Sequence, residues 1–211
     1  MANVPFLSLV YRLQTPIPDA PLPHLAERMR QATAVFCEKS ESYTSRLDPI
    51  TAVEKQAVYD VDTPTETRVV KFLRLNFEGT KLIPSSEAQL DNEAPGWEST
   101  FQKPRWYFYR NNELTLAPVP PATAPIAVTG LVALKPSMNA RSIDEDFAEE
   151  NLQAIIDGAL SLLYGEPNRV WADPSLAAYH KALFEGAITD ATSKARQDHT
   201  AKHGVMVYGG Y

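Results

Sequence analysis

The sequence has one cysteine, no long apolar run and no concentration of positive charge. Because Cys37 has no second cysteine to pair with inside the chain, a reducing environment is the simpler expectation. No stretch approaches the roughly 20 apolar residues that a membrane span needs. The first 18 residues lack the basic start and the small-residue cleavage pattern of a signal peptide. We therefore expect a protein that has no contact with membranes.

Negative charge exceeds positive charge. The 211 residues include 20 Lys and Arg against 26 Asp and Glu, which gives a formal net charge of −6. Tight nucleic-acid binding normally needs a clustered basic surface, so this balance argues against it. Weak or passing contact with DNA is compatible with the composition.

The motifs of the common enzyme classes are absent from the sequence: it has no Walker A, no G-x-G-x-x-G and no G-x-S-x-G. His24 and His180 fall in expected helices, with no cysteine or carboxylate cluster at metal-ligand spacing. His199 and His203 are four residues apart but lack the glutamate and third ligand of a zinc-protease site. We predict no catalytic, metal or cofactor-binding residues and no cofactor.

Two further candidates for chemistry have simpler structural interpretations. Cys37 follows Phe36 on the apolar side of an expected helix, which indicates a buried thiol. The acidic run DEDFAEE at 144–150 lacks the glycine of a calcium loop. Consecutive helical positions do not face each other, so Asp144, Glu145 and Asp146 make a poor acid and base pair. The run suits the first turn of a helix, where acidic groups complement the macrodipole.

Proline is the one abundant special residue, with 17 against 9 glycines, and it is spread singly along the chain. Several prolines punctuate runs with strand character, as strand ends and edges tolerate them. The runs RWYFYR and ELTLAP are joined by Asn111-Asn112, which can adopt a hairpin turn. In an alternating strand, half of the four aromatics in RWYFYR face a core, which favours packing over a nucleic-acid platform.

Helical periodicity appears at both ends of the chain. The segment DAPLPHLAERMRQATAVFCEKS, residues 19–40, places Leu25, Met29, Ala32 and Phe36 on one face of a helix. An apolar stripe follows the acidic run, and Asp173-Pro174 is a strong start signal for a last helix. On that helix we expect Leu176, His180, Leu183, Ala187 and Ala191 to run down one side, with Tyr179, Phe184 and Ile188 beside them.

These patterns predict an α+β fold. It has a helical-bundle core of one N-terminal and two C-terminal helices, an inserted antiparallel β module and extended terminal arms. The expected parts are an N-terminal arm at 1–18, a helical core at 19–41 and 144–198, a β module at 42–143 and a C-terminal arm at 199–211.

Several stretches in order resemble the head-to-tail adaptor, or connector, proteins of tailed phages. They are HLAERMRQATAVFCEKSESY, the strand progression from AVYDV to APGWE, KPRWYFYRNNELTLAPVP, and the region from VALKPSMN to LFEGA with its Gly158-Ala159-Leu160 step. The similarity covers residues 22–195. It implies a structural virion protein of the neck, assembled in the host cytoplasm, that forms a dodecameric ring beneath the portal and leads DNA toward the tail.

The resemblance also implies partners: copies of the chain itself, the portal protein and a downstream tail or nozzle protein, with non-specific passage of genomic DNA. The tail GVMVYGGY is β-prone and has little charge, which suits strand addition to a partner's sheet edge. Its candidate portal-binding residues are Val205, Met206, Val207, Tyr208 and Tyr211. The alternative is a disordered C-terminus without a binding role, as chain termini often are.

Three other functions stay open at this point. The first is another neck or tail role, such as stopper, tail terminator or minor tail protein. The second is a cell-wall-degrading enzyme that uses Asp144, Glu145 and Asp146. The third is a host protein that binds a small ligand, for which the sequence offers no polar cluster lining an apolar stretch.

Overall fold

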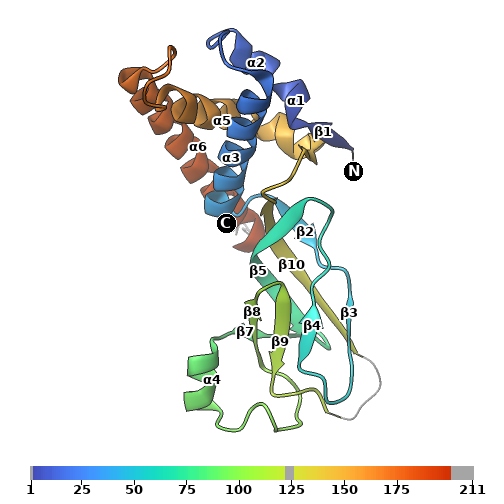
Figure 1. The fold of residues 1–211 in the computed structure, drawn as a ribbon. Helices are drawn as coiled ribbons and strands as arrows, with labels where there is room; N and C mark the ends of the chain where they lie inside the picture. Colours follow the sequence, from blue (N-terminus) through green and yellow to red (C-terminus); the bar gives the residue numbers. More distant parts are fainter. Residues whose placement is uncertain (1, 122–125, 201–211) are drawn as a thin grey trace, which may run out of the picture. The chain divides into compact units, whose positions relative to one another are not determined.

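The computed structural model describes residues 2–121 and 126–200, and for residues 198–200 it describes the backbone alone. The chain divides into two compact units (Figure 1). One, the helical unit, consists of Met1–Ser42 and Ile143–Tyr211, and the other, the β unit, is Tyr43–Ser142. Each unit buries its own set of apolar side chains.

Three long helices pack together in the helical unit: α3 (Leu22–Ser40), α5 (Glu145–Tyr164) and α6 (Pro174–Thr200). The expected face of α3 is confirmed, because Leu25, Met29, Ala32 and Phe36 are all buried. The ring of Phe36 lies 6.3 Å from that of Phe147 on α5 and 6.1 Å from that of Phe184 on α6. Aromatic contacts therefore join all three helices.

The helix boundaries follow from capping side chains. The carboxylate of Asp144 accepts a hydrogen bond from the Phe147 amide at 3.0 Å, which caps α5. The Asp173 carboxylate accepts from the amides of Ser175 and Leu176, so the expected start of α6 is confirmed. At the end of α3, Glu41 adopts a left-handed conformation with φ of 53°.

One helical glycine allows the three long helices to approach closely. A β-carbon at Gly158 would lie 2.7 Å from the Phe184 ring and 3.0 Å from the Ala32 β-carbon. Ordinary carbon contacts are about 3.5–4.0 Å, so a side chain at this position would push against both neighbouring helices. The Gly158-Ala159-Leu160 step therefore has a packing role.

The expected extended N-terminal arm at 1–18 is wrong. The segment forms a short strand, β1 (Asn3–Pro5), followed by two helical turns, α1 (Phe6–Leu9) and α2 (Tyr11–Gln14). Its buried residues lie at steps of four, three and four along the chain, which is a helical spacing: Phe6, Val10, Leu13 and Ile17. The prolines suggested extension, but Pro5 and Pro16 flank the helical turns and do not interrupt them. β1 pairs with β11 (Ser142–Asp144) in a two-stranded sheet.

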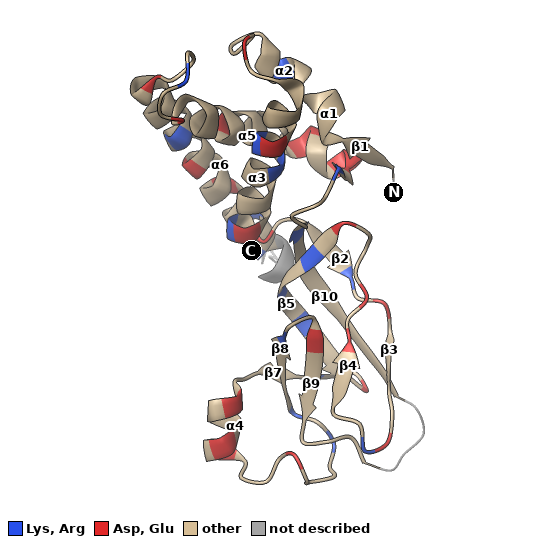
Figure 2. Ribbon diagram, in the orientation of Figure 1, with Lys and Arg blue, Asp and Glu red and all other residues tan. Residues whose placement is uncertain are grey.

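Charge is distributed unevenly between the two units (Figure 2). The β unit carries eleven Lys and Arg and eleven Asp and Glu, so it is formally neutral. The helical unit has nine basic and fifteen acidic residues, and the whole net charge of −6 lies there.

The β unit is built from two sheets. The first has the order β2-β10-β5-β6, with β3 also pairing with β10, and the second has the order β4-β9-β8-β7. Strands of the first sheet are β2 (Thr44–Arg46), β3 (Ile50–Ala52), β5 (Thr67–Phe77), β6 (Thr80–Lys81) and β10 (Ile126–Pro136). Strands of the second are β4 (Val58–Asp60), β7 (Ile83–Pro84), β8 (Trp106–Arg110) and β9 (Glu113–Ala117). Pairing is antiparallel except between β7 and β8.

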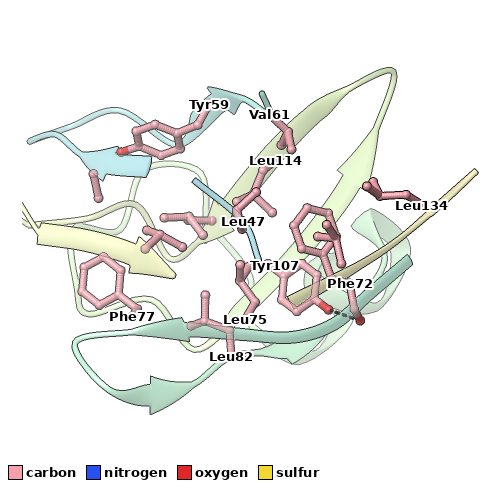
Figure 3. Close-up of a cluster of buried hydrophobic side chains, with 14 residues drawn as sticks. Leu47, Tyr59, Val61, Phe72, Leu75, Phe77, Leu82, Tyr107, Leu114 and Leu134 are labelled. Atoms are coloured by element: carbon pink, nitrogen blue, oxygen red, sulfur yellow. Dashed lines mark hydrogen bonds between the residues drawn. The ribbon is translucent and has the colours of Figure 1, made fainter. Parts of the chain in front are cut away.

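A hydrophobic core lies between the two sheets (Figure 3). Phe72 of β5 packs edge-on against Tyr107 of β8, with ring centroids 5.6 Å apart. The Tyr107 hydroxyl reaches the Phe72 carbonyl at 3.5 Å. On the opposite side of the second sheet lies a smaller apolar cluster. It consists of Leu90 of α4 (Glu87–Glu93), Trp97 and Ala117.

The expected turn at Asn111-Asn112 is confirmed, and a second two-residue turn lies at Gly79. Asn111 and Asn112 join β8 to β9 with φ of 53° and 70°, the left-handed pair that a two-residue hairpin of this type requires. Gly79, with φ of 72°, turns β5 into β6.

The expectation of a helical-bundle core with a β module inserted into it is wrong. The described strands form three sheets, and one strand pair includes the N-terminal segment. The β unit buries its own cluster of fourteen apolar residues. Sheets that face each other across such a cluster form a core of their own. The fold therefore has both a helical and a β core.

Candidate functional site

The described residues contain no group of three or more His, Cys, Asp and Glu side chains that could hold a metal ion. Cys37 is buried, and burial raises the pKa of its thiol far above the ordinary value, which keeps it protonated and unreactive. No described helix is long and apolar enough to cross a membrane.

His180 is paired with the buried carboxylate of Asp157, a contact that no sequence pattern indicates. Its Nδ1 lies 2.8 Å from Oδ1 of Asp157 on α5, and the Gln153 amide donates to the other oxygen at 3.2 Å. The imidazole stacks on the Tyr164 ring, with centroids 5.7 Å apart and planes at 15°. These contacts tie α5 to α6, so the pair holds the helices together.

His24 belongs to a second ionic cluster, centred on Glu166. Its Nε2 lies 2.7 Å from Oε1 of Glu166, and the Arg28 Nε–H donates to the same oxygen at 2.7 Å. Arg169 approaches the other oxygen at 3.7 Å. Burial opposes ionisation of Glu166, but the hydrogen bonds from His24 and Arg28 prevail and lower the pKa of the carboxyl group. The cluster attaches the start of α3 to the loop that joins α5 and α6.

The acidic run at 144–150 does not form a pair of catalytic carboxylates. Asp144 is buried and caps α5, whereas Glu145 and Asp146 are exposed on its first turn. Glu150 forms an ion pair with Lys194 of α6. The arrangement matches the interpretation of the run as a helix start.

The aromatics of RWYFYR serve as core residues. Tyr107 is buried between the sheets, and Tyr109 packs against the same cluster. Trp106 and Phe108 project from the other face and pack against the α4 cluster, where Phe108 meets Trp97 edge-on at 5.8 Å. The core interpretation of this strand is confirmed.

The helical unit exposes an apolar groove where α3, α5 and α6 meet. The groove has a volume of about 370 Å³. Its apolar lining includes Val35, Leu162 and Phe184, and Lys39, Lys181 and Glu185 stand at its polar side. Val35 and Leu162 are exposed.

A second exposed apolar surface runs along α6. Leu176, Tyr179 and Leu183 are three and four residues apart and share one face, and Tyr179 is 59% exposed. The buried residues of α6 include Phe184 and Ile188, which were expected beside the row, whereas Leu176 and Leu183 of the row itself are exposed. Burial of that neighbouring face turns Leu176 and Leu183 outward. We refer to Leu176, Tyr179 and Leu183 as the α6 stripe.

The candidate portal-binding residues lie outside the described part of the chain. They are Val205, Met206, Val207, Tyr208 and Tyr211. His203 also lies outside it, and only the backbone of His199 is described, as part of α6.

The features described above are two helical contact surfaces and two ionic clusters that join helices. No curated protein matches the chain in a sequence comparison. A comparison with protein families matches residues 5–206 to the SU10 adaptor protein family. The match includes residues 5–18 and part of the tail, which the resemblance did not cover, and it confirms the expected relation to phage head-to-tail adaptors. The chain belongs to the SU10 adaptor protein family.

Proposed function

We propose that this chain is a structural protein of the phage neck that assembles as a dodecameric ring beneath the portal and links the capsid to the tail around the DNA channel. Membership of an adaptor family implies interaction with phage portal and tail proteins and a place in the virion neck. An adaptor of this kind acts by fitting its neighbours and needs no active site.

The observation that carries the proposal is the presence of two separate apolar surfaces on the helical unit. The groove and the α6 stripe lie on different sides of α6. Ala178, Lys181 and Glu185 line the groove, and at 3.6 residues per turn they fall on the side of the helix away from the stripe. A subunit of a closed ring needs two different contact surfaces, one for each neighbour. Exposed contiguous apolar surfaces of this kind mark sites of protein association.

Charge on the helical unit is consistent with a position beside DNA. The unit carries the whole net charge of −6. Like charge would keep a passing duplex from adhering to the wall of a channel. This point supports a conduit without selecting it over other neck roles.

The test is binding to the purified portal protein of the same phage, followed by particle mass in solution. We expect a complex that contains several copies of the chain per portal. Leu183→Glu should prevent assembly of those copies, because it places a charge in the α6 stripe. Ala182→Glu is the matched control, since it adds the same charge at an exposed position outside the stripe. Failure of the unaltered chain to bind the portal would contradict the proposal, and binding to a tail protein alone would indicate a stopper or terminator.

The same portal-binding measurement also tests the role of the C-terminal tail. The proposed portal contacts are Val205, Met206, Val207, Tyr208 and Tyr211, which would add a strand to a sheet edge of the portal. Removal of residues 201–211 leaves α6 intact and should weaken portal binding. Unchanged affinity would remove the tail from the proposed interface.

A further inference from the structure

The outer face of the first β sheet carries only positive charge among its ionisable groups. In the register of β10 with β5, Lys135 is opposite Arg68, Ala133 is opposite Lys71 and Leu131 is opposite Arg74. Leu131 is also opposite Arg46 of β2, and Asn76 of β5 is opposite Lys81 of β6. Directly opposed residues of paired strands share a face.

Six cations therefore project from the same side of this sheet. We call them the basic face: Arg46, Arg68, Lys71, Arg74, Lys81 and Lys135. The alternate positions of β5 and β10, among them Phe72, Leu75, Val128 and Val132, are buried in the core. Five of the six cations are exposed, and Lys135 is half-buried. Figure 2 shows the basic positions along β5 and on β2.

The outer face of the second sheet carries a pocket with the opposite character. The pocket has a volume of about 390 Å³ and lies between the sheet and the segment around α4. Its apolar lining includes Val58, Trp97 and Phe108. Three carboxylates stand around it: Glu87, Glu98 and Glu113.

The negative charge of this pocket is only partly balanced inside the unit. Arg110 also lines the pocket, lies directly opposite Glu113 in the pairing of β8 with β9, and approaches Glu87 at 3.5 Å as an exposed pair. Among the described residues, no ion pair is formed by the carboxylates of Glu98, Glu113 or Asp60. Asp60 lies directly opposite Glu113 in the pairing of β4 with β9. Like charges opposed across two strands destabilise a sheet, so the arrangement suits a cation supplied from outside.

We propose that the basic face of one copy docks onto the acidic pocket of the next copy, with an arginine from that face inserted between the half-buried Phe108 ring and the carboxylates. Arginine fits this lining because its planar guanidinium both stacks on aromatic rings and binds carboxylates through two parallel hydrogen bonds. The two faces lie on opposite sides of the core, so the contact is head-to-tail. Repetition of a head-to-tail contact generates a ring or a filament.

This inference rests on the proposed function, since it names a lateral contact of the proposed ring. It adds a partner surface in the β unit to the apolar surfaces of the helical unit. The β unit is formally neutral as a whole, so the complementarity arises from the separation of its charges onto two faces.

The first test is zero-length carbodiimide cross-linking between lysines and carboxylates in an equal mixture of unlabelled and ¹⁵N-labelled full chain at low ionic strength. We expect cross-links of mixed isotope between Lys81 and Glu98 or Glu113. The portal is not needed for this measurement. Absence of any mixed-isotope link between the two faces would overturn the proposal and leave the portal-binding proposal untouched.

The second test uses charge reversal and sedimentation at high protein concentration. R46E/R74E and E98R/E113R should each weaken self-association at least about tenfold, because each places like charges against each other. A mixture of the two variants, and the chain with all four changes, should recover association. K55E/R105E alters the same number of basic residues outside both faces and should have no effect.

Two results would overturn the proposal. One is self-association of R46E/R74E and of E98R/E113R that is as strong as that of the unaltered chain. The other is binding of a 30-base-pair duplex, measured by fluorescence anisotropy, that R46E/R74E removes while self-association is absent from the unaltered chain. That second result would assign the basic face to nucleic acid.

Discussion

Replacement of Gly158 by alanine should destabilise the helical unit, although alanine is the better helix former. In a helix interior, alanine is favoured over glycine by about 1 kcal/mol. At position 158 the new β-carbon would lie 2.7 and 2.9 Å from two atoms of the Phe184 ring and 3.0 Å from the Ala32 β-carbon. Overpacking of a dense interior costs about 1–3 kcal/mol, and contacts this short belong near the upper end.

The net effect of Gly158→Ala should therefore be a loss of about 1–2 kcal/mol of unfolding free energy, or roughly 4–8 °C in the transition of this unit. The assay is urea and thermal unfolding followed by circular dichroism at 222 nm, where the helices dominate. Addition of Phe184→Leu should recover part of the loss, because it shortens the side chain that the new methyl group meets.

Gly186 of α6 provides the matched control. A β-carbon there would meet no atom within 4 Å, so Gly186→Ala should gain about 0.5–1 kcal/mol from helix propensity alone. The two substitutions are chemically identical and should differ in sign. Equal stabilisation by both would refute the close approach of α3, α5 and α6 at Gly158.

Three further changes test the clusters and cores. Glu166→Gln should lower stability at pH 7 by about 1–3 kcal/mol, since it leaves His24 and Arg28 without their anion. The folded-state pKa of Glu166 is depressed, so the stability that its ionised carboxylate contributes is present above the ordinary pKa of 4.5 and is lost as pH falls below that value. A plot of urea midpoint against pH should therefore be flatter for the variant. The same pH dependence in both proteins would refute the role given to Glu166. Asp144→Ala should cost α5 about 1 kcal/mol through loss of its cap, and a value within error of zero by the same unfolding assay would refute capping. Phe72→Ala should cost the β unit about 3–5 kcal/mol in chemical unfolding followed by tyrosine and tryptophan absorbance, and retention of full stability would show that its core does not depend on that ring.

The sequence predicted those elements whose signals are local. The face of α3, the Asn111-Asn112 hairpin and the Asp173 cap each depend on residues close together in the chain, and each was found where expected. The N-terminal segment was not, because Pro5 and Pro16 obscured the helical spacing of the apolar residues between and beside them.

Features that depend on distant residues could not be read from the sequence. His24 and Glu166 are separated by 142 positions, and nothing near either residue indicates the other. On α6, an apolar stripe at helical spacing has the same appearance whether it faces a core or a partner. Only the burial of Phe184 and Ile188 shows that Leu176 and Leu183 face outward. The basic face likewise depends on the register of β2, β5, β6 and β10, which the sequence alone does not reveal. The net negative charge of the whole chain gives no indication of a local cluster of cations.

The most direct test of the account is electron cryo-microscopy of the virion neck at a resolution that traces main chain. The account predicts a closed ring of copies of this chain between the portal and the tail, with the helical units in lateral contact through the groove and the α6 stripe. A neck map that contains no such ring, or virions that assemble and infect normally without the chain, would contradict it.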